Sequence, residues 1–381
     1  MPAPVPADRI LVDLLGFTGS RGGTETYARE LLVRLPALLP DATFAALTGR
    51  VGAERVRGFF PGAVHALPWV RDDAVSWAVG AVAGTELFAR RNGADLVWAP
   101  ANFGPVFRGT PRVVTVHDAI YDEVRGSVGE RVMRAATSTL MRRSATTADR
   151  VITVSRSAAT AIRTHLGVAP DRISVVHNGS RDPRPQPDPR ATVARLRLPA
   201  NRPILLSTGN RMPHKNFEGL LAAIAEIPRD RRPVAVIAGG REGDPLRATV
   251  DRLGLEDDVI LPGWVSDEEL EALYQVADLY VCPSLAEGFG LPVVDAMRRE
   301  VPVLAHDIPV LREVGGDAAR YSDARSPRTF AAAIVAALQT APGEAQRREA
   351  ADWAARFTWD AAAQGTAAVL TEIIRSRRNT P

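Results

Sequence analysis

Short apolar runs alternate with stretches of helical apolar spacing along most of the chain. Runs with the length of buried strands lie at residues 9–15, 95–99, 112–116, 150–154, 173–176, 204–207, 234–238, 259–261, 279–283 and 301–305. Helical spacing occurs at residues 24–39, 133–148, 156–166 and 358–374, with Ser155 as the expected N-cap of the third helix. This alternation predicts parallel βαβ units.

A proline-rich stretch divides this pattern into two halves. Arg181–Arg190 contains four prolines and alternating charges, which is typical of a stiff, exposed linker. We therefore predict an α/β protein with two Rossmann-like, doubly wound domains, at residues 1–183 and 184–357, facing across a cleft. Residues 358–381 are assigned to a separate C-terminal helical segment.

The composition is that of a globular chain without disulfide bonds. Of 381 residues, 46% are hydrophobic and 24% are charged, with a net charge of +3 and a sequence pI near 9.4. This balance suits anionic ligands, while no zinc-type spacing or RNA-binding motif points to nucleic acid. Cys282 is the only cysteine, which fits a reducing compartment. Because no signal-peptide pattern or bilayer-length apolar run is found, we expect a cytoplasmic protein.

The run from Ile204 to Leu220 carries an unusual cation. It is predicted to pass from a strand through a turn at Gly209 to a helix, with Arg211 and Lys215 in between. Lys215 is the only lysine among the 47 basic residues. Lysine offers a compact charge on a flexible stem, suited to meeting phosphate oxygens end-on. A phosphate site near a helix N-terminus is one interpretation, and an ordinary surface lysine is the other.

A second loop, Ser284–Met297, carries acidic groups among glycines. Glu287 lies at the carboxyl edge of the predicted sheet, where a carboxylate can accept hydrogen bonds from sugar hydroxyls. The amides of Gly290 and Leu291 can face a phosphate. Asp295 is expected in the first turn of the next helix, where a charge favourable to the helix dipole is the simpler explanation.

Two further loops follow strands of the first domain. Gly22 and Gly23 precede a helix and would allow close approach of a ligand, although a plain tight turn explains them equally well. His117 and Asp118 end another strand, where His117 is either a core histidine or a site residue. Since ligands of such sheets bind outside the carboxyl ends of strands, we expect all of these loops to line one interdomain cleft.

Taken together, these motifs resemble those of the retaining glycosyltransferases of family 4, which have the two-domain GT-B fold. The marks of this resemblance are Gly22-Gly23, His117-Asp118, Arg211 with Lys215-Asn216, Glu287–Pro292, Asp307–Glu313 and Phe357–Trp359. The Pro213–Asn216 variant and the segment before His117 are similar to bacterial polysaccharide and O-antigen transferases, often mannosyl- or rhamnosyltransferases. The resemblance covers nearly the whole chain.

The resemblance implies a role for each matching position. Arg211 and Lys215 would hold the donor diphosphate, Glu287 would bind the sugar hydroxyls, and His117 would point at the donor sugar. Asp295 stands where the family usually has a glutamate that clamps the ribose. The remaining donor-site positions are Gly22, Gly23, Gly209, Trp264, Val265, Gly288, Phe289, Gly290 and Leu291, with Trp264 and Val265 beside the nucleobase. A second departure is Arg299-Glu300, where the family commonly has a glycine. The C-terminal helix would return to the first domain.

The reaction implied is transfer of a hexosyl group, mannosyl or similar, from a nucleotide diphosphate sugar to a hydroxyl, with retention of configuration. No Asp-x-Asp motif occurs in the chain, so we expect no metal and no cofactor. The acceptor would be a glycan, a lipid-linked glycan or a natural product, near Asn102, Phe103 and Asp118.

Two alternatives stay open. A GT-B epimerase would need no acceptor, and a catalytically silent subunit would only bind the sugar nucleotide. A phosphorylase would need a lysine for pyridoxal phosphate, and Lys215 is already assigned to the diphosphate. The arginines between Arg134 and Arg143 allow peripheral contact with the inner face of the cell membrane, although a solvated helix face is the simpler explanation.

Overall fold

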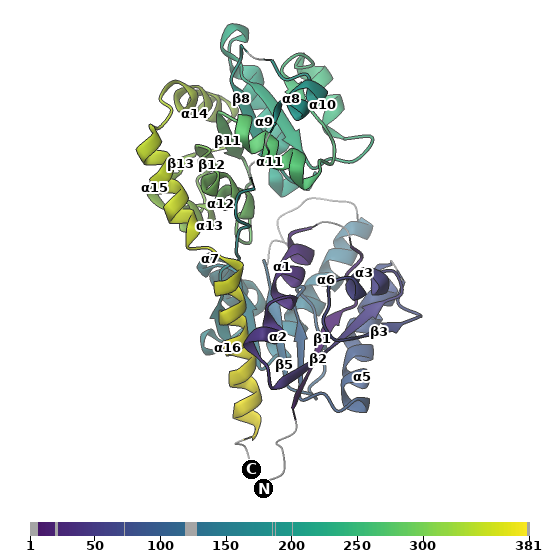
Figure 1. Cartoon of the computed structure of the whole chain (residues 1–381). Helices are drawn as coiled ribbons and strands as arrows, with labels where there is room; N and C mark the ends of the chain where they lie inside the picture. The colour runs from purple at the N-terminus through teal and green to yellow at the C-terminus, as the bar shows by residue number, and fades with distance from the viewer. Residues whose placement is uncertain are drawn as a thin grey trace. The chain divides into compact units, whose positions relative to one another are not determined.

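The computed structural model describes residues 7–19, 22–71, 73–118, 128–184, 186, 188–199 and 201–378, with the side chains at 74–75, 128–136 and 190 left out (Figure 1). Arg134 and parts of the predicted linker therefore lie outside the described side chains. The chain divides into two compact units: unit 1 comprises residues 1–179 and 358–381, and unit 2 comprises residues 180–357. The division falls just before the proline-rich stretch.

Unit 1 is built on a seven-stranded parallel sheet with the order β3-β2-β1-β4-β5-β6-β7. Its strands are β1 Asp8–Leu14, β2 Ala42–Gly49, β3 Ala63–Leu67, β4 Leu96–Ala99, β5 Arg112–Val116, β6 Arg150–Thr153 and β7 Ile173–Val175. Strands β1, β4, β5, β6 and β7 confirm the predicted apolar runs. β2 and β3 were not predicted, and β3 is a half-exposed edge strand without a continuous apolar run.

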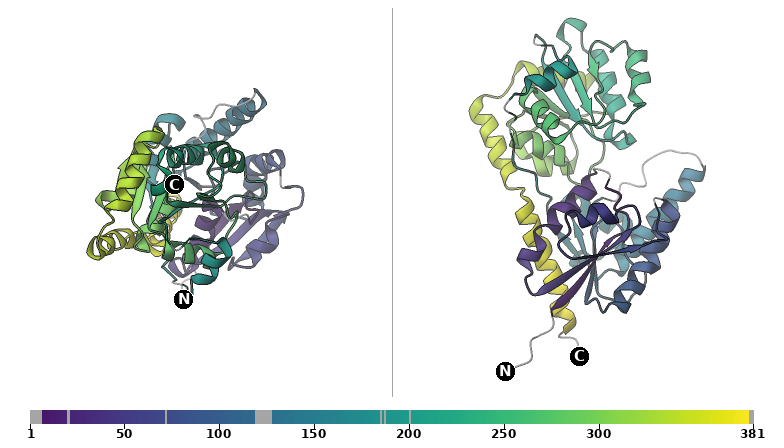
Figure 2. Two further views of the ribbon diagram at one scale, coloured as in Figure 1. Left: turned by 90° about the horizontal axis from the view of Figure 1, so that it is seen from above. Right: turned by 45° about the vertical axis from the view of Figure 1, so that its right-hand side comes forward.

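Helices cover both faces of the unit 1 sheet, as Figure 2 shows. They are α1 Gly23–Leu32, α2 Leu35–Leu38, α3 Ala53–Arg57, α4 Ala74–Val79, α5 Thr85–Arg91, α6 Val128–Thr147, α7 Arg156–Ala161 and α16 Trp359–Arg378, with π-helical turns at Gly80–Gly84 and Ile162–Leu166. The Ser155 cap is confirmed, since its hydroxyl accepts a hydrogen bond from the Ala158 amide. The single helix expected at 24–39 is wrong: Pro36 cannot donate to the helical ladder, and the helix ends before it.

Two groups of side chains fix which helices lie on which face. The Trp98 ring lies edge-on to Tyr27 of α1, while Leu11 and Val97 pack in one buried cluster with Ala89 of α5 on the other face. α16 packs against β4, β5 and β6 on the α1 side, so the C-terminal helix completes unit 1. This agrees with the expected return of the chain to the first domain.

Unit 2 has a six-stranded parallel sheet with the order β10-β9-β8-β11-β12-β13. Its strands are β8 Ile204–Thr208, β9 Val234–Ala238, β10 Val259–Ile260, β11 Leu279–Cys282, β12 Val303–His306 and β13 Arg320–Ser322. All but β13 confirm predicted runs. β12 begins at Val303 rather than Val301, because Pro302 has no amide to give to the sheet.

The helices of unit 2 are α8 Arg190–Leu196, α9 Phe217–Glu226, α10 Leu246–Leu253, α11 Asp267–Val276, α12 Leu291–Arg298, α13 Pro309–Gly315, α14 Pro327–Gln339 and α15 Glu344–Ala355. Leu220 of α9, Val250 of α10 and Phe330 of α14 enter one buried core with the strand residues Leu205 and Val281. α11 and α12 also contact the strands. The doubly wound arrangement leaves the loops after the strands free to form a site.

Candidate functional site

The candidate donor site in unit 2 is formed by loops at the carboxyl ends of β8, β9, β10 and β11. The loop after β8 contains a short 3-10 turn, Pro213–Lys215, and α9 starts only at Phe217. Lys215 therefore precedes the helix rather than opening it. Asn216, in the left-handed conformation, separates turn and helix.

Lys215 and Glu287 meet directly. The Lys215 Nζ lies 2.7 Å from Glu287 Oε1, and the two side chains are only 16% and 10% exposed. The structure thus brings together the lone lysine and the loop carboxylate, which are 72 positions apart in the chain. A buried cation beside a carboxylate can bind an anion and hydroxyl groups at adjacent points.

The loops that carry this pair are fastened to one another. The Leu285 amide donates to the His214 carbonyl at 2.8 Å. Asn216 Nδ2 donates to the carbonyl oxygens of Pro283 and Ala324, at 3.2 and 3.0 Å. Burial and the nearby Lys215 charge lower the pKa of His214, so this imidazole is neutral beside the pair at neutral pH. These bonds hold Lys215 and Glu287 at a fixed spacing.

Arg211 lies in the same loop as Lys215. Its side chain is 8% exposed and forms an ion pair with Asp244, at 2.7 Å from Nη2 to Oδ2. Its guanidinium also lies over the ring of Phe217, 5.0 Å from the centroid. Gly209, at the start of the loop, accepts a hydrogen bond from Arg211 Nη1 through its carbonyl oxygen.

The loop after Glu287 is fixed by its packing. Gly288 is partly exposed, but the Phe289 ring is buried edge-on against Phe357, with centroids 5.5 Å apart. Phe289 is thus a core anchor whose side chain does not face solvent. Gly290 has φ +94°, and a Cβ there would come within 2.7 Å of Leu311. α12 begins at Leu291, which is partly exposed.

Asp295 is not in the first turn of α12, so the prediction that it faces the helix dipole is wrong. Its Oδ1 accepts a hydrogen bond from the Ser180 hydroxyl at 2.5 Å and lies 3.8 Å from Arg299 Nη1. Arg299 in turn pairs with Glu271 of α11. Burial raises the pKa of Asp295, while Arg299 and Ser180 oppose this rise. The Asp295 side chain, which is shorter than the usual glutamate, therefore already has partners within unit 2.

The departure at Arg299-Glu300 has a structural explanation. Glu300 has φ +57° and follows the last turn of α12. Its amide donates to the Met297 carbonyl, and the Val301 amide donates to the Ala296 carbonyl. This is a Schellman motif, in which a glycine is the usual residue. Glu300 thus occupies a position where a side chain is strained.

Trp264 and Val265 follow β10 and lie in opposite environments. The Trp264 side chain is 54% exposed, whereas Val265 is buried. The Gly263 carbonyl, just before them, accepts a hydrogen bond from the Gly239 amide at 2.8 Å. An exposed indole on a braced loop can stack on a planar ligand.

In unit 1, Gly22 is the N-cap of α1 and Gly23 its first residue. Among the described residues, nothing lies within 4 Å of the position that a Cβ would take at either glycine. Both residues are exposed, and packing does not explain why they are glycines. Open space at a helix N-terminus is compatible with the close approach of a ligand.

His117 is a buried, neutral side chain. Its Nε2 lies 2.8 Å from the Pro100 carbonyl, and its ring meets Tyr27 edge-on at 4.7 Å. Burial lowers its pKa to about 4. Because a carbonyl oxygen only accepts hydrogen bonds, the proton sits on Nε2 and Nδ1 keeps its lone pair. His117 can accept a hydrogen bond from a hydroxyl.

The predicted acceptor residues adjoin His117. Asn102, with φ +64°, accepts a hydrogen bond from the His117 amide at 2.6 Å through its side-chain oxygen. Phe103 packs edge-on against Trp77 at 4.8 Å. Asp118 is partly exposed at the end of the described segment. Asn102 and Phe103 follow β4, and His117 and Asp118 follow β5. We call this group of four residues the Asn102–Phe103 corner of unit 1.

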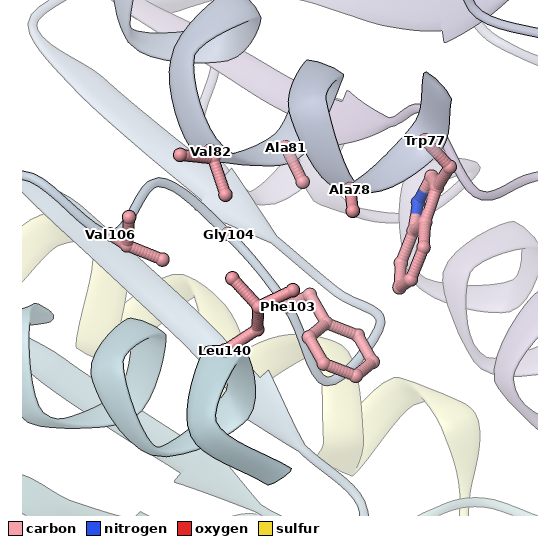
Figure 3. A pocket seen from close by; sticks show the side chains of 8 residues that line it. All are labelled: Trp77, Ala78, Ala81, Val82, Phe103, Gly104, Val106 and Leu140. Atoms are coloured by element: carbon pink, nitrogen blue, oxygen red, sulfur yellow. The ribbon is translucent and has the colours of Figure 1, made fainter. Parts of the chain in front are cut away.

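An apolar hollow adjoins this corner (Figure 3). It is lined by Trp77, Ala78, Ala81, Val82, Phe103, Gly104, Val106 and Leu140. One of its walls is the π-helical turn Gly80–Gly84, and such turns are frequent at functional sites. The hollow is narrow, and the side chains that line it are apolar.

Three polar residues escaped the sequence reasoning. Asp244 follows Gly239-Gly240 at the end of β9, and this position after a strand could have identified it as a site residue. Ser180 could not have been found, since nothing local links it to Asp295. Asp13, at the end of β1, is buried and accepts a hydrogen bond from Thr85 at 2.7 Å. Burial raises the pKa of Asp13 to about 6.

The folds of the two units correspond to a known class. Two parallel α/β units of this kind define the GT-B fold of glycosyltransferases. The sucrose-phosphate synthase from Thermosynechococcus elongatus superposes with a TM-score of 0.76 at 18% identity, covering 97% of this chain and 100% of that structure. This likeness concerns the fold.

The family is shown by two matches along the chain. Residues 21–181 match the family described as Glycosyltransferase Family 4, and residues 190–353 match Glycosyl transferases group 1. The chain therefore belongs to the family 4 and group 1 glycosyltransferases, as the motifs predicted.

Two curated relatives show which kinds of glycosyltransferase the chain is similar to. The O-antigen chain mannosyltransferase B of Escherichia coli is 36% identical over 168 residues, covering 41% of this chain and 42% of the relative. The D-inositol 3-phosphate glycosyltransferase of Streptomyces bingchenggensis is 34% identical over 254 residues, covering 61% and 54%. The chain thus spans about half the length of the curated relatives it matches.

Within the described residues, no helix is long and apolar enough to cross a membrane, and no group of three or more His, Cys, Asp or Glu side chains could hold a metal ion.

Proposed function

We propose that this protein is a retaining glycosyltransferase that moves a hexosyl group, mannosyl or similar, from a nucleotide diphosphate sugar to a hydroxyl. The observation that carries the proposal is the contact of Lys215 with Glu287. One group can neutralise the diphosphate, and the other can hold the sugar hydroxyls next to it. The mannosyltransferase relative supports the choice of sugar.

Unit 2 holds the donor in this proposal. Lys215 lies against the diphosphate, Glu287 accepts hydrogen bonds from the sugar, and the exposed Trp264 stacks on the base. Asp295 binds the ribose when Ser180 gives up its hydrogen bond. His117, which carries its proton on Nε2, accepts a hydrogen bond through Nδ1 from a hydroxyl of the reacting sugars.

In the reaction, the acceptor oxygen forms a bond to the anomeric carbon while the bond to the leaving diphosphate breaks. A phosphate oxygen of the leaving group takes the acceptor proton, so attack and departure share one face of the sugar. The Lys215 cation and backbone amides stabilise the charge that develops on the diphosphate. NMR of the product linkage tests retention, and an inverted linkage would contradict this mechanism.

The acceptor side of the proposal rests on unit 1. The residues Asn102 and Phe103, with His117 and an apolar surface beside them, suit an acceptor that joins hydroxyl groups to an apolar portion, such as a lipid-linked glycan or a natural product. Arg142 and Arg143 are exposed on α6 and allow contact with anionic lipid. Flotation with anionic vesicles tests this contact: binding at low salt that is lost at high salt supports it.

The decisive experiment is a donor screen. Purified protein is incubated with each common nucleotide sugar, with and without oligosaccharide acceptors, and the released nucleoside diphosphate is measured. We expect slow hydrolysis of one donor alone and faster release with an acceptor. Isomerised donor without release would indicate an epimerase, and binding without any turnover would indicate a silent subunit.

We propose that the reaction needs no divalent ion, since the chain has no Asp-x-Asp motif and the Lys215 cation lies at the site. Turnover measured after EDTA treatment should be unchanged. Loss of activity that returns with magnesium or manganese would contradict this part of the proposal.

A further inference from the structure

Every donor of the Arg211 guanidinium already has an oxygen partner within unit 2. Arginine has five N–H groups. Nε lies 3.0 Å from both carboxylate oxygens of Asp244. Nη1 donates to the carbonyls of Gly209 and Ala238 at 3.0 and 3.4 Å, and Nη2 donates to the Ile237 carbonyl and to Asp244 at 2.8 and 2.7 Å. No N–H group is left over for a phosphate oxygen.

Asp244 is equally committed. Its side chain is 9% exposed, and its Oδ1 also accepts a hydrogen bond from the Leu246 amide at the start of α10. Burial alone would raise the pKa of Asp244, but the hydrogen bonds from Arg211 hold it below its usual value. The pair therefore ties together the end of β8, the end of β9 and the first turn of α10.

The glycines after β9 are shaped around this pair. A Cβ at Gly240 would lie 2.1 Å from Asp244 Oδ2 and 2.8 Å from Arg211 Nη2. Gly239 has φ +99°, and its Cβ would lie 2.6 Å from the Gly209 carbonyl oxygen. Both glycines are thus explained by the Arg211–Asp244 pair and by the loop it holds, without a ligand.

A phosphate contact by Arg211 would break these bonds. It would also leave the Asp244 carboxylate buried and without its cation, which is unfavourable. With the pair intact, the carboxylate largely cancels the guanidinium charge toward the site. Lys215, on the same loop, has the side chain that faces the Glu287 carboxylate.

We propose that Arg211 and Asp244 are positioning residues that set the Gly209–Lys215 loop, and that Lys215 alone makes the direct cationic contact with the donor diphosphate. This inference rests on the proposed function. It assigns to Asp244 a role in donor binding although its charge repels the donor.

The two possible roles of Arg211, phosphate contact and loop positioning, predict opposite effects of Asp244→Asn on donor binding. If Arg211 contacts the diphosphate, Asp244→Asn frees the guanidinium, removes a repelling charge and tightens donor binding. If the pair positions the loop, Asp244→Asn loosens the loop and weakens donor binding. Calorimetric titration of the full chain with GDP and with UDP measures this. Glu344→Gln, which removes the exposed ion pair between Glu344 and Arg348 on α15, is the matched control.

We expect Asp244→Asn to weaken binding of the preferred nucleotide about tenfold and to raise the donor KM more than it lowers kcat, with Glu344→Gln like wild type. Equal or tighter binding by Asp244→Asn would overturn the inference. Circular dichroism confirms that the titrated variant is folded.

A structure of the wild-type protein with the bound nucleotide gives a second answer that needs no variant. Arg211 still paired with Asp244 supports the inference, and Arg211 turned onto a phosphate overturns it. If wild-type protein binds neither GDP nor UDP and shows no turnover in the donor screen, the proposed function itself fails, which is a separate result.

Discussion

Replacing Lys215 with alanine removes the only lysine of the chain and the partner of Glu287. In the structure the Lys215 Nζ and Glu287 Oε1 lie 2.7 Å apart, and both side chains are mostly buried. The change therefore has two consequences that must be separated. One is the loss of a cation for the diphosphate, and the other is a carboxylate left without its partner.

Both magnitudes follow from this geometry. Breaking a buried ion pair by removing one partner costs about 3–5 kcal/mol. Because both side chains retain some exposure to solvent, we expect a loss of unfolding free energy near the lower end, about 3 kcal/mol. Loss of one preorganised charge-stabilising donor lowers kcat by roughly 10² or more, or about 2.7 kcal/mol of transition-state stabilisation.

A second change separates the two consequences. In the double variant Lys215→Ala with Glu287→Gln no charged carboxylate is left behind, so chemical denaturation should show most of the stability restored. Turnover should stay low, because no cation meets the diphosphate. Lys215→Arg keeps the charge but replaces a point charge by a planar fork, and we expect it to lose about tenfold in kcat.

The assay is initial-rate release of the nucleoside diphosphate from the donor found in the screen. The single lysine also allows a direct observation, since reductive methylation with isotope-labelled formaldehyde places one NMR reporter on its side chain. Its resonance should shift when the nucleotide binds. Near-normal turnover in Lys215→Ala, or full activity in Lys215→Arg, would refute the reasoning that this site depends on lysine.

Three further predictions concern stability. Burial raises the pKa of Asp13 to about 6, so its contribution is present at low pH and is lost as the pH rises from 4 through 6. Asp13→Asn should therefore stabilise unit 1 at pH 7 by up to about 3 kcal/mol and have little effect at pH 4, as measured by hydrogen exchange. The pKa of His117 is lowered to about 4, so its contribution is present above pH 6.5 and is lost as the pH falls toward 4. His117→Gln should reduce this loss of unfolding free energy at low pH, which amounts to about 3 kcal/mol. The same pH dependence of unfolding in the variant as in wild type would contradict the attribution to His117. Glu300→Gly should stabilise unit 2 by about 0.5–1 kcal/mol, because glycine adopts the left-handed conformation without strain. A lower melting temperature for this variant would show that the Glu300 side chain contributes more than its backbone costs.

The sequence was sufficient for the elements that depend on local pattern. Buried parallel strands such as Val234–Ala238 are continuous apolar runs, and they are recognisable because both of their faces are covered. The loops that follow them carry Lys215 and Glu287, and parallel strand order places these loops at one edge of the sheet. The edge strand β3 was not predicted, because this half-exposed strand lacks such a run.

Tertiary structure alone decided which groups became partners. Arg211 and Asp244 are 33 positions apart, and Ser180 and Asp295 are 115 positions apart, so no local periodicity relates them. The sequence motif predicts that Arg211 contacts the phosphate, because it identifies Arg211 only as a cation in a loop. The fold instead surrounds this cation with oxygen atoms that come from β8, β9 and the start of α10. A charged side chain can be named from the sequence, but whether it is free to act depends on which other chain segments reach it, and strand order and burial determine that.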